Sequence, residues 1–155
     1  MNTFQYSIVA VLMLCIMVGL SVFVLYPGTS VQPSQATEFT YVNASADDIV
    51  VDLPFPGAVT GKEFSVIGKA RGYWFFEASF PVFVYDAAGN QLAVGLAAPE
   101  PPDSEWMTTE FVDFKADLVI PQSYIGPATL VLKKDNPSGE PEHDGSVAFP
   151  FTIEY

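Results

Sequence analysis

Every charged side chain of this chain lies on one side of a sharp boundary. Residues 1–37 contain no Asp, Glu, Lys, Arg or His, and all 18 acidic and 6 basic residues come after them. Within the uncharged part, residues 6–26 are almost all apolar, and as a helix they would span roughly 32 Å of hydrocarbon. Tyr6 and Tyr26 lie at the two ends, where aromatic rings favour the headgroup layer, and Pro27 ends the helix. This run predicts a transmembrane helix over residues 6–26.

Two other kinds of N-terminal segment have a similar composition. A cleaved secretory signal has a shorter apolar core, of about 7–15 residues, and a small-residue cleavage site, which this run lacks. A lipoprotein signal needs a small residue before its cysteine, whereas bulky Leu14 precedes Cys15. The sequence favours an uncleaved anchor over residues 1–26. Because Cys15 is the only cysteine, the rest of the chain is expected to lack disulfides.

The next segment, residues 27–46, is rich in Pro, Ser and Thr and predicts a flexible stalk whose ends lie roughly 25 Å apart. Neither flank of the apolar run carries Lys or Arg, so the usual signal for membrane topology is missing. The composition of the stalk favours an extracytoplasmic position for the residues C-terminal to it. We therefore expect a single-pass protein of the cell membrane with an extracytoplasmic domain over residues 47–155.

From residue 47 onward, apolar residues alternate with polar ones, and no window of a dozen residues has the period of an amphipathic helix. Turn signals separate the alternating runs, which fall near residues 49–53, 64–68, 73–85, 92–96, 112–120, 130–132 and 147–155. This spacing predicts an all-β domain, an immunoglobulin-like antiparallel β-sandwich of about seven to nine strands. An up-and-down barrel of similar size is the alternative.

The longest run, residues 73–85, predicts one strand whose even positions, from Trp74 to Val84, form a continuous core face. The next five residues, Asp86-Ala87-Ala88-Gly89-Asn90, have hairpin-turn chemistry. Trp74 is expected in the core rather than on a binding platform. Arg71 and Glu77 flank the start of this run and are expected to form a structural ion pair.

Two later residues interrupt the alternation. Phe111 lies on the polar parity just before a regular run, which predicts a β-bulge or a change of sheet near Glu110. Pro150 lies within the final run and predicts an edge strand, because proline cannot donate to a ladder on both sides.

Four groups of residues occur one after another in a recognisable order. They are Gly68-Lys69-Ala70-Arg71-Gly72 with the aromatic run up to Val82, then Trp106-Met107-Thr108, then Phe111 to Phe114, and finally Leu132-Lys133-Lys134-Asp135-Asn136-Pro137-Ser138-Gly139. In this order they resemble the immunoglobulin-like domain associated with bacterial sporulation and spore-germination proteins. The resemblance covers residues 49–155 and departs from the family at Gly61-Lys62-Glu63-Phe64, where members have a Ser-Pro-Leu-like step. It implies an immunoglobulin-like sandwich in the bacterial envelope and no catalytic activity.

The net charge of −12 at pH 7 excludes the basic surface that nucleic-acid binding requires and disfavours docking on anionic lipid. No catalytic residues are expected. The only histidine, His143, lies in a charged loop, and no Ser-His-Asp set can be assembled from the spacing. We therefore predict a protein that is not an enzyme and that has no cofactor.

The loop over residues 135–144 concentrates oxygen-bearing side chains. Asp135, Glu140 and Asp144 are weak candidates for calcium ligands, although their spacing is not that of an EF-hand. A solvated hairpin with an Asx-type turn at Asp135 or Asn136 explains the same residues, and we favour this interpretation, without a metal.

Trp106 and Met107 come after a proline-rich loop and are the candidate partner-binding residues, since exposed aromatic and Met side chains mark interfaces. Two functional classes remain open. The leading one is a non-catalytic binding or structural module of the envelope that recognises a protein or a glycan. The alternative is a protease inhibitor or a calcium-dependent adhesion module on the same kind of scaffold.

Overall fold

The computed structural model describes residues 38–102 and 104–155, and this part of the chain consists of β-strands and two short 3₁₀ helices. The strands are β1 (Thr40–Val42), β2 (Ile49–Leu53), β3 (Val59–Thr60), β4 (Glu63–Arg71), β5 (Phe80–Asp86), β6 (Gln91–Pro99), β7 (Phe111–Val119), β8 (Gly126–Lys133) and β9 (Ser146–Ile153). The 3₁₀ helices are η1 (Gly72–Trp74) and η2 (Pro141–His143). The predicted all-β class is confirmed for these residues. The predicted helix over residues 6–26 lies outside them.

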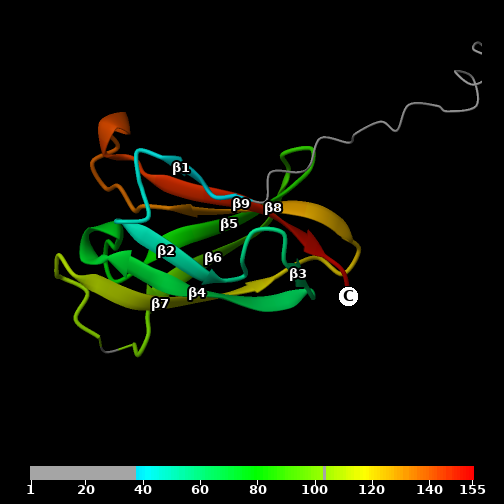
Figure 1. Ribbon diagram of the computed structural model, residues 1–155, viewed down its shortest axis with the longest axis horizontal. Helices are drawn as coiled ribbons and strands as arrows, with labels where there is room; N and C mark the ends of the chain where they lie inside the picture. Colours follow the sequence, from blue (N-terminus) through cyan, green and yellow to red (C-terminus); the bar gives the residue numbers. More distant parts are fainter. Residues whose placement is uncertain (1–37, 103) are drawn as a thin grey trace, which may run out of the picture. The chain divides into compact units, whose positions relative to one another are not determined.

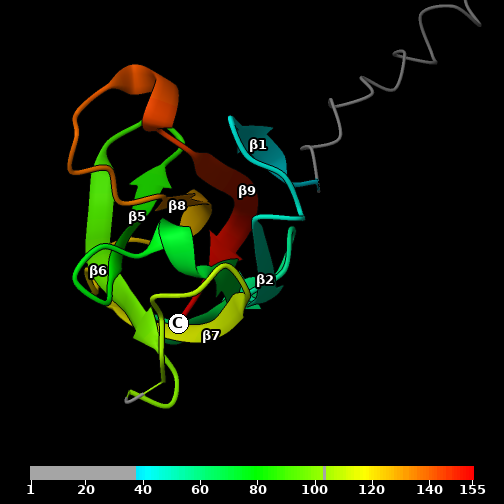
Figure 2. The same ribbon diagram turned by 90° about the vertical axis from the view of Figure 1, so that its left-hand side faces the viewer.

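The strands form one curled sheet in the order β1-β9-β8-β5-β6-β7-β4-β2, and β3 pairs with β9 beside this path (Figure 1). All pairings are antiparallel except that of β3 with β9. Strand β6 pairs with β5 over most of its length and with β7 at Ala98 and Pro99. The view along the strands in Figure 2 shows β5, β8 and β9 on one side, β7 and β2 on the other, and β6 on the flank between them. The curl therefore encloses a core between two halves.

Aromatic rings join the two halves. Phe80 of β5 makes edge-to-face contacts with Trp74 at 5.9 Å and with Phe114 of β7 at 5.0 Å between centroids. Toward the other end, Phe64 of β4 meets Phe151 of β9 at 5.5 Å. Trp74 is 1% exposed, which confirms its expected place in the core. Burial of such rings stabilises a fold by about 1.5–3 kcal/mol each, which suits a core without disulfides.

The prediction of one long strand over residues 73–85 is wrong in its first half. Strand β5 begins only at Phe80, after η1 and a tight turn closed by the bridge between Phe76 and Ser79. Helix η1 turns the chain so that consecutive residues Trp74 and Phe75 both enter the core. The alternation is thereby lost, and Phe76, expected to be buried, is 42% exposed. From Phe80 onward the predicted core parity holds, and Val82 and Val84 are buried. The hairpin after it is also confirmed, with Gly89 at a φ of 85°.

Strand β7 has no bulge near Glu110, contrary to the prediction. Its ladder with β4 is regular from Glu63↔Val119 to Arg71↔Phe111. Phe111 faces outward because cations cover its ring: the Arg71 guanidinium carbon lies 4.1 Å from the ring centroid and the Lys69 ammonium 5.2 Å. The strand that changes from one half of the sheet to the other is β6, which pairs with both β5 and β7.

The final strand, β9, is not an edge strand, and that prediction is also wrong. It has β8 on one side and both β1 and β3 on the other. Pro150 lies between the residues that pair with β1 and those that pair with β3, and its carbonyl accepts a hydrogen bond from Gly57 N at 2.8 Å. The missing N–H of proline faces this interruption, where no ladder bond is lost.

The folded part begins before residue 47, within the segment predicted as a stalk. Strand β1 pairs with β9, and Phe39 contacts Phe149 edge to face at 5.0 Å. Three residues of ladder and one aromatic contact therefore tie residues 39–42 to the sheet. This pairing was not visible in the composition of the segment.

Candidate binding site at the loop end

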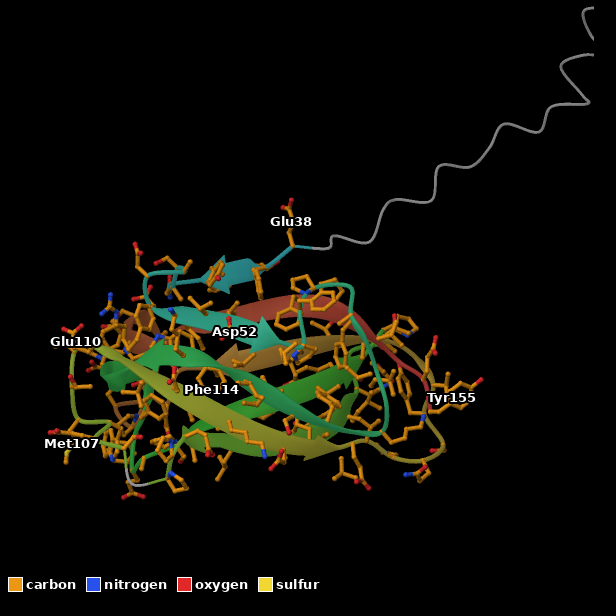
Figure 3. All side chains as sticks on the ribbon, turned by 60° about the horizontal axis from the view of Figure 1, so that its bottom comes forward. Glu38, Asp52, Met107, Glu110, Phe114 and Tyr155 are labelled. Atoms are coloured by element: carbon orange, nitrogen blue, oxygen red, sulfur yellow. The ribbon has the colours of Figure 1, made fainter. Side chains whose placement is uncertain are left out.

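Three connecting segments meet at one end of the sheet. Strand β4 leads into η1, residues 104–110 lead into β7, and residues 134–145 join β8 to β9. Figure 3 shows Met107 and Glu110 at this end and Tyr155 at the opposite one. We call the end formed by residues 71–79, 104–110 and 134–145 the loop end.

Gly72 allows the first two segments of the loop end to touch. A Cβ at this position would lie 2.1 Å from the carbonyl oxygen of Thr108 and 2.2 Å from that of Trp106. The amide of Gly72 donates to the Glu110 carbonyl at 3.2 Å. Only glycine permits so close an approach of two backbones. Residues 104–110 consequently lie directly on η1.

The two predicted partner-binding residues differ in their surroundings. Trp106 is half-buried and packs against the hydrophobic core. Met107, next to it, is 74% exposed. Met107 is therefore the surface group, whereas Trp106 holds the loop to the domain.

Arg71 ties the loop end together and does not pair with Glu77 as predicted. Its Nε donates to the Asp47 carbonyl at 2.9 Å and its Nη1 to the Thr109 carbonyl at 3.2 Å. Its carboxylate partner is Glu110, with Nη1 and Oε2 3.7 Å apart. Glu77 lies in the turn beyond η1 with a φ of 51°. Because the chain turns after η1, Arg71 pairs with Glu110 and not with Glu77. The alternation of apolar and polar residues does not reveal this turn.

Tyr73 and Asp48 form a second polar link. The Tyr73 hydroxyl donates to Asp48 Oδ1, and Asp48 Oδ2 accepts from the Ser45 amide at 2.7 Å and the Ser45 hydroxyl at 2.9 Å. The hydrogen bond from Tyr73, followed by those from Ser45, lowers the pKa of Asp48. Burial, followed by the bond to Asp48, raises the pKa of Tyr73 to about 12. At neutral pH the carboxylate is charged and the phenol is protonated.

Loop 134–145 is held by hydrogen bonds among its own polar groups. Asn136 Nδ2 donates to the Glu140 carbonyl at 2.9 Å and to Asp144 Oδ1 at 2.8 Å. Asn136 Oδ1 accepts from the Ser138 amide at 3.2 Å and the Ser138 hydroxyl at 2.5 Å. This is an Asx-type turn at Asn136, one of the two predicted positions.

The candidate metal ligands Asp135, Glu140 and Asp144 are not brought together. Among residues 38–102 and 104–155, no group of three or more His, Cys, Asp or Glu side chains lies close enough to hold a metal ion. Asp144 instead accepts from Asn136, and the Glu140 carboxylate lies 3.5 Å from His143 Nδ1. The carboxylates of Asp144 and Glu140 therefore make contacts within the loop.

Ser138, His143 and Glu140 contain the residue types of a nucleophilic triad without its geometry. The Ser138 hydroxyl lies 3.1 Å from His143 Nδ1, and the Glu140 carboxylate approaches the same nitrogen at 3.5 Å. In a triad the acid orients one ring nitrogen, and the other ring nitrogen takes the proton of the nucleophile. Here both groups approach Nδ1, so the contacts are not those of a triad and hold the loop together.

The loop end exposes three large apolar side chains beside carboxylates such as Glu77, Glu110 and Glu142. Tyr73, Phe76 and Met107 are 48%, 42% and 74% exposed. A shallow pocket of about 310 Å³ lies against η1, with Lys134 and His143 among the residues around it. The Lys134 ammonium lies 5.8 Å from the Tyr73 ring centroid. The sequence contains a signal for exposed rings here, because residues 73–76 are four consecutive aromatic residues. One core face cannot take all four side chains, so some of them have to be exposed.

Comparisons with known proteins do not indicate a function for this chain. No protein-family model, curated protein or solved structure matches it. Within the described residues, no helix is long and apolar enough to cross a membrane.

Proposed function

We propose that this chain is a non-catalytic binding or structural module of the bacterial envelope, held at the cell membrane by residues 1–26 and related by resemblance to sporulation and germination proteins. The observation that carries the proposal is the exposure of Tyr73, Phe76 and Met107 together at the loop end. Aromatic and Met side chains are enriched at protein interfaces and supply much of their binding energy. The loop end is the binding surface.

The order of strand pairing supports an immunoglobulin-like sandwich as the scaffold. Strands β2, β4 and β7 are neighbours in one half, and β5, β8 and β9 in the other. The chain crosses from the first half to the second between β2, which pairs with β4, and β3, which pairs with β9. This matches the division of immunoglobulin strands A, B and E from C, F and G. Loops at the end of such a sandwich are its usual binding elements.

The chemistry of the loop end favours a protein over a glycan. Sugar recognition needs polar side chains with free hydrogen-bonding capacity beside an aromatic ring. Asn136 and Ser138 are already hydrogen-bonded to each other, and the Tyr73 hydroxyl donates to Asp48. The exposed surface that remains is a Met and two rings beside carboxylates such as Glu77, Glu110 and Glu142, which suits a partner protein with apolar and basic side chains.

The position of the loop end suits a tethered module. Glu38, the first described residue, lines a pocket together with Ala87, in the turn after β5, and Pro127, at the start of β8. The proposed anchor and the first part of the predicted stalk come before Glu38. The residues around Glu38 lie toward the end of the strands that is opposite the loop end.

The proposal is tested by affinity capture of the full chain from solubilised envelope, with Met107→Ala and Phe76→Ala as variants. Both side chains are exposed, so the variants should stay folded, whereas Trp106→Ala removes core packing. Val119→Ala is the matched control, because Val119 is 64% exposed at the opposite end of β7. We expect a specific partner that is lost with the two loop-end variants and kept with the control. Equal capture by all variants would contradict the proposal.

The membrane topology has its own test, protease digestion of intact cells. An extracytoplasmic domain is expected to be cut, or labelled by an impermeant reagent, without rupture of the membrane. Labelling only after rupture would place the domain inside and remove the envelope from the proposal.

A further inference from the structure

The half of the sheet formed by β5, β6, β8 and β9 has an unusual outer face. Directly paired residues share a face, and the register places Val94 opposite Phe83, Phe83 opposite Val131, and Val131 opposite Ala148. The neighbours of these residues along the strands, such as Val82, Val84 and Leu130, are buried in the core. The row from Val94 to Ala148 therefore faces away from the core.

This outer face is apolar. Val94 is 55% and Leu96 64% exposed, and Phe83 and Tyr85 are half-buried and stacked on each other at 6.0 Å. Antiparallel sheets with one solvated side carry polar residues there. Contiguous exposed apolar surface on a soluble domain marks an interaction site. We call the outer side of β5, β6, β8 and β9 around Phe83 the apolar face.

No outward strand position of the apolar face carries a carboxylate, although the chain has a net charge of −12. Glu38 borders the face, in a pocket that it lines with Pro127, Thr129 and Pro150. The outward strand positions of the face are Pro81, Phe83, Tyr85, Gln91, Val94, Leu96, Pro127, Thr129, Val131, Lys133, Ser146, Ala148, Pro150 and Thr152. The one charge, Lys133, lies in the last position of β8, with its ammonium 5.4 Å from the Phe83 ring centroid. The outer side of β4 and β7 is different, because it carries Lys69, Asp113, Lys115 and Asp117.

We propose that the apolar face pairs with the same face of a second copy of this chain. Two strongly acidic copies repel each other wherever carboxylates come into apposition, and this face removes that cost. A two-fold axis requires one patch to be complementary to itself, and an uncharged apolar patch meets that condition. Lys133 is the one charge that such a pairing has to accommodate, and its ammonium lies over the Phe83 ring, whose π face attracts a cation.

The proposal does not depend on the proposed function, because the loop end lies at the end of the strands and the apolar face along their side. A dimer of this kind leaves Tyr73, Phe76 and Met107 accessible. Loss of dimerisation and loss of partner binding are therefore separate results from separate variants.

The test is the protein mass of the full chain in mild detergent, measured by size exclusion with light scattering. The variant Val94→Glu with Leu96→Glu adds two carboxylates at exposed positions, and Ile67→Glu adds one on the opposite outer side, where Ile67 is 38% exposed. We expect the unmodified chain and Ile67→Glu to have twice the single-chain mass and the double variant to have the single-chain mass. Circular dichroism checks that each variant keeps its β spectrum and melting transition.

A second measurement covers the case in which the double variant fails to fold. In a Cys15→Ser background, Val131→Cys at the centre of the face should give a covalent dimer on mild oxidation, whereas Ile67→Cys should not. A single-chain mass for the unmodified chain, or a dimer that survives the double variant, would overturn the proposal. So would binding of the face to phosphatidylcholine vesicles by a chain that stays monomeric.

Discussion

Tyr73 has two separate contacts, one through its ring and one through its hydroxyl. The ring is exposed at the loop end with Lys134 beside it, and the hydroxyl donates to Asp48, which precedes β2. The hydroxyl therefore fixes the orientation of a ring that we propose for partner binding. A Phe at this position would keep the ring and lose the bond.

Tyr73→Phe is expected to lower the free energy of unfolding by about 0.5–1.5 kcal/mol at pH 7, the usual worth of one hydrogen bond. The pKa of Asp48 is lowered in the folded chain, so its contribution is present above the ordinary carboxyl pKa and is lost as pH falls through the folded value. The pKa of Tyr73 is raised to about 12, so its contribution is lost as pH rises from about 10 toward 12.

The difference in melting temperature between the unmodified chain and Tyr73→Phe should consequently be largest near neutral pH and narrow at both extremes. Asp48→Asn provides the matched variant, and the double variant should lose little more than either single one. A difference that does not vary with pH would mean that the hydroxyl makes no such bond.

Individual residues also show where the alternation of apolar and polar residues fails to predict which side chains are buried. Phe111 broke the predicted pattern because two cations cover its ring on the outer side of the sheet. Their position across the strand depends on the register of β4 with β7, which a single sequence does not contain. Trp74 was placed correctly in the core, although it lies in η1 and not in the strand that was predicted over residues 73–85.

At the scale of elements, the contact between η1 and residues 104–110 organises the loop end. It depends on Gly72, whose hydrogen lies where any side chain would strike the carbonyls of Thr108 and Trp106. The two segments are more than 30 residues apart in the chain, and the glycine is what lets them meet.

Gly72→Ala is expected to destabilise the chain by about 1–3 kcal/mol, the usual cost of forcing a methyl group into a filled space. The rigid atoms nearby are backbone, so relief requires residues 104–110 to move away from η1. Gly145→Ala is the control, since its Cβ would meet its nearest neighbour at 3.4 Å, an ordinary contact. Chemical denaturation measures both. Equal stability of the two variants would show that the segments do not touch as described.

The class of most elements could be predicted from the sequence, and their boundaries only in part. The runs that became β5, β7 and β9 had correct core parity over most of their length. Helix η1 was missed because one turn of 3₁₀ helix leaves no periodicity, and β1 was missed because three residues in a Ser- and Thr-rich segment resemble a linker. Of the exposed apolar residues at the loop end, only Met107 was predicted as a binding residue. The sequence does not show which loops lie together at one end of the sheet.

At the scale of the whole described unit, the apolar face and the loop end differ in charge. The outward strand positions of the apolar face carry no carboxylate, whereas the loop end carries exposed Glu77, Glu110 and Glu142 beside its apolar side chains. Part of the net charge of −12 therefore lies at the loop end, where it favours a partner with basic side chains. If both proposals hold, a dimer presents two loop ends, and a partner with two sites would bind with avidity.

The central claim, that the loop end binds a protein, is tested most directly by a photo-crosslinking amino acid in place of Met107 in intact cells. Position 119, exposed at the other end of β7, serves as the matched site. We predict one discrete adduct at position 107 that is absent at position 119 and that mass spectrometry assigns to an envelope protein. No adduct at 107, or the same adducts at both positions, would contradict the account.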